Sequence, residues 1–152
     1  MIAVIRVRGS VNLKPDIKYT LDLLNLFRPN NMVLVKKEKQ FLKMVEKVKD
    51  YVTFGEIKPE VLAKVLEKRG KIGKEKIDEE QLKKMKVTSF EELAELIVSG
   101  KSGLEQLGIN KVFRLRPPKK GYERKGIKKP YSIGGALGNR KEKINDLILR
   151  MI

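Results

Sequence analysis

Alternating apolar and polar residues predict that the chain begins with a β-strand over residues 2–8. Ile5 and Val7 fall on one side of such a strand, and Arg6 and Arg8 fall on the other. We expect the apolar side to be buried. The side that carries Arg6 and Arg8 is expected to be an open, basic sheet face.

Apolar residues spaced three and four apart predict a helix after this strand. Ile17, Leu21 and Leu24 stand at i, i+4 and i+7, and Pro15 suits the first turn. The same spacing predicts a second helix, over about 38–50.

Two further strands, over residues 32–37 and 52–57, complete this pattern. The first 57 residues therefore read β-α-β-α-β with short connections. Two helices would cover one face of a small sheet and leave its other face open.

The rest of the chain divides into a mostly helical extension over 58–110 and a C-terminal unit over 111–152. The C-terminal unit has a strand around Phe113 and a last amphipathic helix that begins near a capping-box pattern at Asn139 and Glu142. The extension contains a helix over 60–69, a polar connector over 71–77, a short helix capped by Asp78, a helix from the Ser89 capping box to about Val98, and turns over 103–109.

Charge is concentrated in one part of this chain of 152 residues and net charge +16. Residues 111–131 hold nine Lys or Arg and one acid, which is half of the whole excess. Charge runs are usually solvated faces, and the mixed Glu/Lys helices fit that interpretation. The 111–131 stretch does not, because almost no acids interrupt it. A polyanion is the partner that such a surplus favours.

Residues 117–137, which we call the basic arm, lack helical or strand periodicity. Proline and glycine keep the segment extended, and it has too little apolar surface to fold alone. We therefore expect a mobile arm that becomes ordered on nucleic acid. Its lysines and arginines would neutralise phosphates, and Tyr122 and Tyr131 would stack on unpaired bases. The alternative for both tyrosines is packing at the root of the arm.

Glycines near the end of the arm offer a second kind of RNA contact. Gly135 and Gly138 have the G-x-x-G spacing of one RNA-binding clamp, although no helix leads into them, so the match is weak. A flexible turn is the simpler explanation. Glycine backbone beside Arg140, at the beginning of a helix, could also approach a phosphate.

Composition argues against catalysis. The chain has no Cys, His or Trp, so disulfides, thiol nucleophiles and Cys/His zinc sites are excluded. The GKIGK sequence at 70–74 lacks the spacing and the hydroxyl residue of a phosphate-binding P-loop. Neighbouring acids such as Glu91 and Glu92 point in different directions on a helix. We expect no catalytic residue, metal site, cofactor or small-molecule substrate.

The chain is also expected to be a soluble cytoplasmic protein with no membrane partner. The apolar run at its beginning is too short for a signal peptide, and no stretch reaches the length of a membrane span.

Several stretches in order resemble a known family. IAVIRVRG, KYTLDLLNLFRPNNMVLV, VFRLRPPKKGY and GGALGNRKEKINDLILRM are similar to archaeal large-subunit ribosomal proteins of family thirty in the universal numbering, whose eukaryotic relative is numbered seven. The resemblance covers essentially the whole chain. It implies an α+β fold with a ferredoxin-like β-α-β-α-β core and an antiparallel three-stranded sheet of order 3-1-2.

The resemblance also implies a structural role in the large ribosomal subunit, bound to 23S ribosomal RNA, close to 5S ribosomal RNA and beside other large-subunit proteins. Carried over by position, the RNA-contacting residues are Arg114, Arg116, Lys119, Lys120, Arg124, Gly134, Gly135, Asn139 and Arg140. The arm tip matches no family pattern, so contacts from Tyr122, Lys125, Lys128, Lys129 and Tyr131 rest on charge and stacking alone, as those of Arg6 and Arg8 rest on the open sheet face. The alternative function is an RNA-modifying or processing enzyme that uses carboxylates and Mg²⁺.

Overall fold

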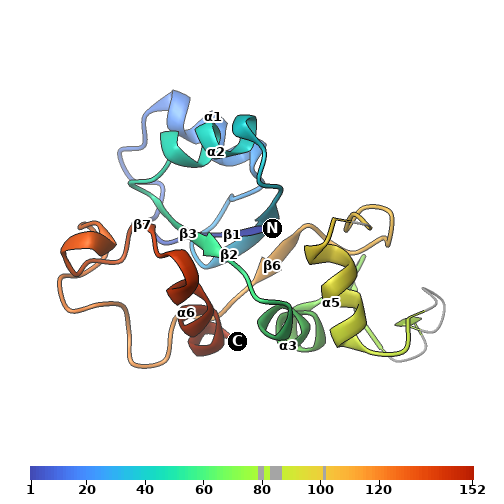
Figure 1. The fold of residues 1–152 in the computed structure, drawn as a ribbon. Helices are drawn as coiled ribbons and strands as arrows, with labels where there is room; N and C mark the ends of the chain where they lie inside the picture. The colour runs from blue at the N-terminus through green and yellow to red at the C-terminus, as the bar shows by residue number, and fades with distance from the viewer. Residues whose placement is uncertain (79–80, 83–86, 101) are drawn as a thin grey trace.

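A five-stranded sheet of order β6-β2-β1-β3-β7 organises the protein in the computed structural model (Figure 1). The structure describes residues 1–78, 81–82, 87–100 and 102–152. The strands of this sheet are β1 (Ile2–Arg6), β2 (Asn31–Val35), β3 (Val52–Glu56), β6 (Val112–Arg114) and β7 (Gly138–Asn139). The helices are α1 (Pro15–Leu23), α2 (Lys39–Lys47), α3 (Pro59–Arg69), α5 (Phe90–Val98) and α6 (Ile144–Met151), with 3-10 turns η1 (Tyr131–Ile133) and η2 (Lys141–Lys143).

The centre of the sheet is the predicted core. β1 pairs antiparallel with both β2 and β3, and Ala3 lies opposite Leu34 on one side and Gly55 on the other. The predicted α+β class and the central strand order 3-1-2 are confirmed. Two edges come from the C-terminal unit: β6 runs antiparallel to β2, and the two-residue β7 runs parallel to β3. The sequence predicted β6 but not β7, which is too short to show a pattern.

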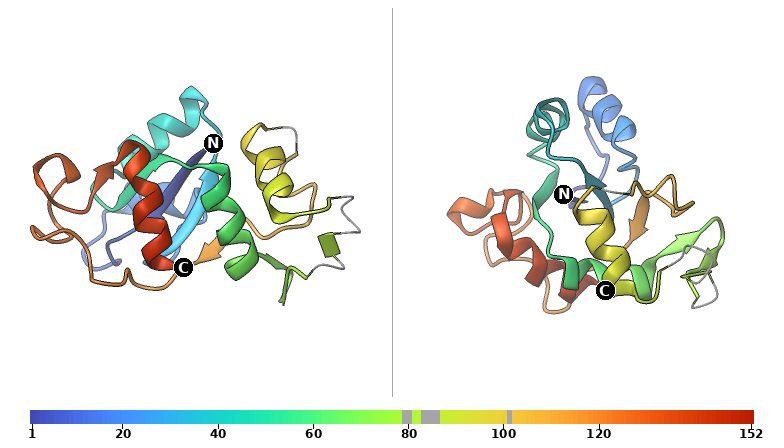
Figure 2. Two further views of the ribbon diagram at one scale, coloured as in Figure 1. Left: turned by 60° about the horizontal axis from the view of Figure 1, so that its bottom comes forward. Right: turned by 45° about the vertical axis from the view of Figure 1, so that its right-hand side comes forward.

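Helices cover both faces of the sheet (Figure 2). Ile2 and Val4 of β1 pack in one apolar cluster with α1 and α2. Ala3 and Ile5 pack in a second cluster with α3, α5 and α6. The expected open sheet face is therefore wrong. The two sides of β1 were also assigned the wrong way round: the Val4 side packs under α1 and α2, and the Ala3 and Ile5 side is the one that the chain after residue 57 folds back to cover.

Arg6 is buried beneath the α1 side of the sheet, with only 2% of its surface exposed. Its guanidinium donates hydrogen bonds to the carbonyl oxygens of Leu26 (2.7 Å), Phe27 (2.9 Å) and Arg8 (3.0 Å), and to Oγ of Ser10 (2.8 Å). Burial lowers the pKa of Arg6, while the charge of Asp22 opposes that shift. Arg6 was expected on an open face; it instead fastens the loop between α1 and β2.

Gly55 lets α6 approach β3 closely. A Cβ atom on Gly55 would lie 2.1 Å from the carbonyl oxygen of Lys141 and 2.9 Å from the side chain of Ile144. The beginning of the last helix is thus seated directly on the central sheet. This helix starts at Ile144, after η2, and Asn139 accepts from the backbone N–H of Lys141 (2.8 Å) instead of capping α6.

The extension differs from the sequence prediction in one place. The expected polar connector over 71–77 is a hairpin of β4 (Lys71–Ile72) and β5 (Glu75–Lys76), with Gly73 at a positive φ in its turn. The short helix expected after Asp78 falls largely outside the described residues.

The predicted capping box at the beginning of α5 is present. Oγ of Ser89 accepts from the N–H of Glu92 (3.3 Å), and the Glu92 carboxylate accepts from the N–H of Thr88 (3.0 Å). α5 ends at Val98, before Gly100, which has a positive φ.

Replacing Arg6 with Met should lower the free energy of unfolding by about 3 kcal/mol, because the carbonyls of Leu26 and Phe27 would lose their donor. Urea denaturation of the variant measures this loss. Arg8→Met is the control: Arg8 is half-buried, and its one side-chain hydrogen bond to the described residues goes to the exposed carbonyl of Asp50 (3.2 Å). Arg8→Met should lower the free energy of unfolding by less than about 1 kcal/mol. Equal losses of stability in the two variants would contradict the role given to Arg6.

Candidate nucleic-acid interface

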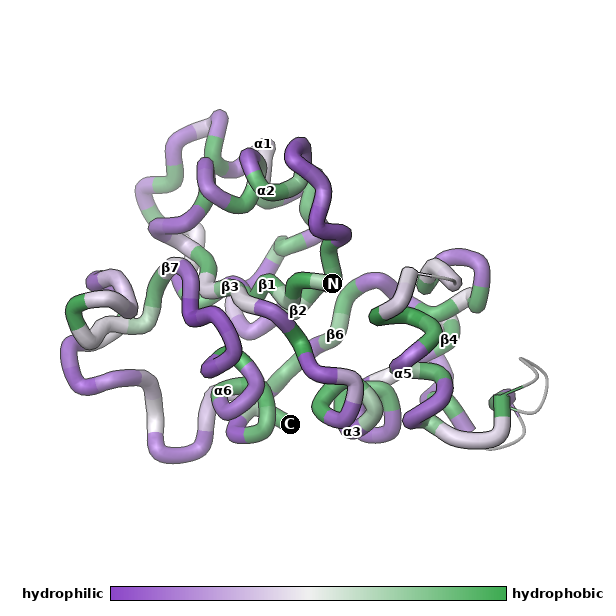
Figure 3. Tube along the Cα trace, viewed as in Figure 1, coloured by the Kyte–Doolittle hydropathy of each residue, from purple (hydrophilic) through white to green (hydrophobic). Residues whose placement is uncertain are grey.

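The basic arm runs from the end of β6 past α6 and returns to the opposite sheet edge at β7 (Figure 1). It is hydrophilic along most of its length (Figure 3). The backbone N–H of Arg116 donates to the carbonyl of Met151 (2.8 Å), and that of Lys119 donates to the carbonyl of Arg150 (2.9 Å). These bonds satisfy free carbonyls in the last turn of α6, so the arm is attached to the body at its root.

A buried ion pair holds the middle of the arm. Arg140 is 3% exposed, and its guanidinium donates to both carboxylate oxygens of Glu123. The same guanidinium donates to Oγ1 of Thr53 (2.8 Å) and to the carbonyl of Ala136 (3.1 Å). It also lies 4.6 Å from the ring centre of Tyr131. Every nitrogen of Arg140 is therefore bonded within the protein, and the arm is tied to β3.

The carboxylate of Glu123 is charged in this setting. Burial alone would raise its pKa, but hydrogen bonds from Arg140 and from its own backbone, together with the charges of Arg140 and Arg150, outweigh burial. The pKa of Glu123 consequently lies below its ordinary value. Arg150 adds a longer contact, with Nη2 3.5 Å from Glu123 Oε1.

The glycine-rich end of the arm is a hydrogen-bonded turn. Gly134 is exposed and has φ of 90°, which favours glycine. Gly135 is buried, and a Cβ there would lie 2.1 Å from the carbonyl oxygen of Lys129. The N–H of Leu137 donates to that same carbonyl (3.2 Å), and the N–H of Tyr131 donates to the carbonyl of Leu137 (2.7 Å). Gly135 thus serves close packing within the arm. Gly134 is exposed, but its N–H donates to the carbonyl of Tyr131 (2.9 Å) and its carbonyl accepts from the N–H of Lys125 (3.3 Å).

Tyr122 packs at the root of the arm. Its ring contacts a small apolar cluster of Val7, Ala136 and Leu137, and its hydroxyl donates to Oδ1 of Asn30 (3.1 Å). Burial raises the pKa of this phenol, the charge of Arg140 opposes the rise, and the charge of Glu123 adds to it. Of the two alternatives, base stacking and packing at the root of the arm, packing is the one that describes Tyr122.

The expectation that the arm has no core of its own is wrong. In the sequence, Glu123 is one acid among many cations, whereas the fold pairs it with Arg140, 17 residues further on. That pair, the apolar cluster around Tyr122 and the Gly135 turn together give the arm a folded shape.

The residues predicted to contact RNA separate into three groups by exposure. Arg6, Gly135 and Arg140 are buried, so the prediction of RNA contact does not fit their positions. Three more are half-buried: Arg8, Tyr122 and Tyr131. The guanidinium of Arg8 lies over the ring of Tyr51. The exposed members are Arg114, Arg116, Lys119, Lys120, Arg124, Lys125, Lys128, Lys129, Gly134 and Asn139.

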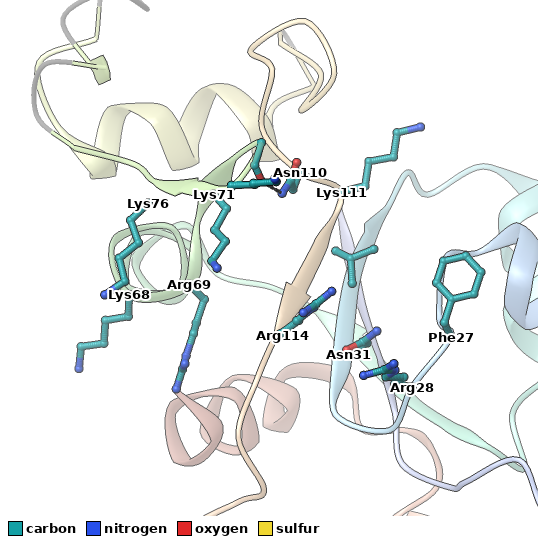
Figure 4. A pocket seen from close by; sticks show the side chains of 13 residues that line it. Phe27, Arg28, Asn31, Lys68, Arg69, Lys71, Lys76, Asn110, Lys111 and Arg114 are labelled. Atoms are coloured by element: carbon teal, nitrogen blue, oxygen red, sulfur yellow. Dashed lines mark hydrogen bonds between the residues drawn. The ribbon is translucent and has the colours of Figure 1, made fainter.

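A second basic surface, not predicted from the sequence, is a groove of about 930 Å³ between β6 and the β4–β5 hairpin (Figure 4). Its cations come from three separate parts of the chain: the basic run 68–76, the loop at Arg28, and residues 111–114. The run 68–76 is visible in the sequence, but its position opposite the other two parts is not. The cations that line this groove are Arg28, Lys68, Arg69, Lys71, Lys74, Lys76, Lys111 and Arg114.

The described residues contain neither a membrane-spanning helix nor a metal-binding cluster of acids. Within the ranges given above, no helix is long and apolar enough to cross a membrane. The same ranges contain no group of three or more acidic side chains placed to hold a metal ion.

Replacing Glu123 with Gln should lower the free energy of unfolding by about 3 kcal/mol, because Arg140 would stay buried without its counter-charge. Trypsin should then cut faster at Arg124 and Lys125, since the pair anchors the arm. Glu105→Gln is the control, because it removes a solvated surface pair with Lys111, whose side chains are 69% and 53% exposed, and it should leave stability and cleavage close to those of wild type. Unchanged cleavage in Glu123→Gln would contradict the anchoring role.

Acid should release the arm in the same way. Because folding lowers the pKa of Glu123, its contribution to stability is complete above the ordinary value of 4.5 and is lost as the pH falls through the lowered value. NMR spectra of the arm amides should change in that acidic range in wild type. In Glu123→Gln the amides should show the released spectrum at neutral pH; a matching acid transition in this variant would assign it to another group.

Comparison with known proteins matches this chain to one family along its whole length. The family described as Ribosomal protein L30p/L7e matches residues 2–52. The large ribosomal subunit protein uL30 of Nanoarchaeum equitans is 50% identical and covers 100% of this chain and 99% of its own length. The protein of the same name is 46% identical in Methanococcus maripaludis (99% and 98% covered) and 43% identical in Methanopyrus kandleri (96% and 100% covered). With relatives 43–50% identical over nearly the full length of both chains, the chain belongs to the L30p/L7e family of ribosomal proteins.

Proposed function

We propose that this protein is a structural constituent of the large ribosomal subunit and binds ribosomal RNA through phosphate contacts. The observation that carries the proposal is the exposure of every lysine and arginine of the arm, while its one acid is occupied by Arg140. Ion pairing inside the arm therefore leaves its outward charge unneutralised. Such charge attracts a phosphate backbone and holds it in place without reading sequence.

The contacts we propose are those of the exposed predicted residues: Arg114, Arg116, Lys119, Lys120, Arg124, Lys125, Lys128, Lys129, Gly134 and Asn139. Arg8 and Tyr131 join them as half-exposed residues at the margin. Arg6 and Arg140 support binding indirectly, since each fixes a segment that presents exposed cations. Gly135 and Tyr122 shape the arm by packing.

The finer proposal concerns the partners. We propose that the principal RNA is 23S ribosomal RNA, that 5S ribosomal RNA lies nearby, and that other large-subunit proteins are neighbours. The family resemblance supports this choice, and a static role requires no cofactor. The alternative of an RNA-modifying enzyme that uses carboxylates and Mg²⁺ has no support, because the full-length relatives carry names of ribosomal proteins.

Co-sedimentation tests the assignment to the large subunit. The protein should remain with large subunits through a moderate-salt wash, and separate titrations with 23S and 5S transcripts should show tighter binding to 23S. Loss from the subunit at moderate salt would overturn the proposal.

Replacing Lys119, Lys120, Lys128 and Lys129 together with Ala should flatten the dependence of log affinity on log salt by about 3, if all four contact phosphate. Affinity should fall for native and scrambled RNA alike, because phosphate contacts carry no sequence information. The measurement is a salt titration of each protein with each RNA.

The matched control replaces four exposed lysines in and just after α2, Lys39, Lys43, Lys47 and Lys49, with Ala. It removes the same charge from the other side of the sheet and should leave the slope near that of wild type. An arm variant that behaves like this control would show that the arm is only solvated, and a loss restricted to native RNA would show that it reads bases.

A further inference from the structure

The groove between β6 and the β4–β5 hairpin concentrates cations from both of its walls (Figure 4). Lys68 and Arg69 come from the last turn of α3, and Lys71, Lys74 and Lys76 come from the hairpin. Across the groove, the sheet edge contributes Arg28, Lys111 and Arg114. None of the described residues that line the groove is acidic.

Most of these cations have no ion-pair partner among the described residues. In the described part of the chain, Lys111 is the one groove cation that forms an ion pair, with Glu105. The dipole of α3 favours Lys68 and Arg69 at its C-terminus. It does not account for the hairpin lysines or for Arg28 and Arg114 on the opposite wall. A hollow with charge of one sign focuses its field and attracts anions.

The two walls are fixed to one another. The side chain of Asn110 donates to the carbonyl of Gly73 (2.8 Å), and its backbone N–H donates to the carbonyl of Lys71 (2.9 Å). A β-bridge between Ile72 and Ile109 adds a second connection. The hairpin is thus tied to the chain that enters β6, and the cations are held in place before a ligand arrives.

Phe27 adds an aromatic surface at the margin of the groove. It lines the groove with 54% of its surface exposed, beside Arg28. The buried guanidinium of Arg6 holds its backbone carbonyl (2.9 Å), so the loop that presents the ring is fixed. An exposed aromatic ring next to free cations is the arrangement on which unpaired bases stack while their phosphates are neutralised.

We propose that this groove is a second RNA site, which binds the backbone of an unpaired strand and stacks one base on Phe27. It lies at the β6 edge of the sheet, whereas the arm returns to the β7 edge (Figure 1). A duplex would keep its bases stacked within the helix and leave Phe27 uncovered. The choice of RNA as the ligand rests on the proposed function. The location of the site rests on the groove alone.

The chain has no Trp, so Phe27→Trp gives a single fluorescent reporter in the groove. The probe is a short single-stranded RNA of mixed sequence, too short to span both edges of the sheet. It should quench the reporter, and the same sequence as a duplex should not. Strong quenching by the duplex, or no quenching by the single strand at low salt, would overturn the stacking.

The second variant replaces Lys68, Lys71, Lys74 and Lys76 with Ala in the same reporter protein. All four are exposed, and a thermal melt checks that the fold is kept. The salt slope should flatten by about 3, and affinity at low salt should fall at least tenfold. Arginine at the four positions should restore binding. The α2 variant at Lys39, Lys43, Lys47 and Lys49 is the control for loss of charge.

The outcomes separate this inference from the proposed function. In one outcome, wild type binds ribosomal RNA, the arm variant binds it more weakly, and the groove variant behaves like the α2 control. The groove proposal then fails, and the proposed function stands. If wild type does not bind ribosomal RNA, the proposed function fails. Tighter binding of an acidic peptide than of the single-stranded RNA in the groove would also overturn the proposal, because the partner would then be a protein.

Discussion

The ion pair between Glu123 and Arg140 determines how the C-terminal third of the chain meets the sheet. The side chain of Arg140 also donates to Oγ1 of Thr53. Its backbone N–H donates to the carbonyl of Phe54 (2.8 Å), next to the β3–β7 pairing. One buried guanidinium therefore joins the arm, the sheet edge and the beginning of the last helix. A buried charge is tolerated only when its counter-charge and hydrogen bonds are complete, and the carboxylate of Glu123 meets that requirement while it remains ionised.

Buried and exposed arginines have different roles in this protein. Arg6 and Arg140 are both almost fully buried, and both use their guanidinium nitrogens to hold loops. Arg6 fixes the segment that presents Phe27 and Arg28, and Arg140 fixes the arm. The planar guanidinium, with five donors, is suited to this because it can bind several oxygens at once. Exposed lysines, which are point charges on flexible stems, form most of the outward surface of the arm.

The two edges of the sheet carry basic segments, and helices cover its two faces. β6 and β7 are short additions to a three-stranded core, and each brings a basic segment with it. A protein that fits among RNA segments benefits from such a division, because the folded centre remains apolar and independent of RNA. The charged edges are then free to neutralise phosphates that would otherwise repel each other.

The sequence by itself determined the β-α-β-α-β core, the helix caps at Ser89 and the concentration of charge in residues 111–131, because periodicity and composition act between neighbours in the chain. The resemblance to a family supplied the strand order. The tertiary structure alone decided that Arg6 and Arg140 are buried, since burial of a charge depends on partners such as Leu26 and Glu123 that lie far away in sequence. It also decided that the second sheet face is covered and that cations from three parts of the chain form one groove. The sequence shows the basic run 68–76 by itself, but the groove, the covered face and the two buried arginines arise only when distant segments meet.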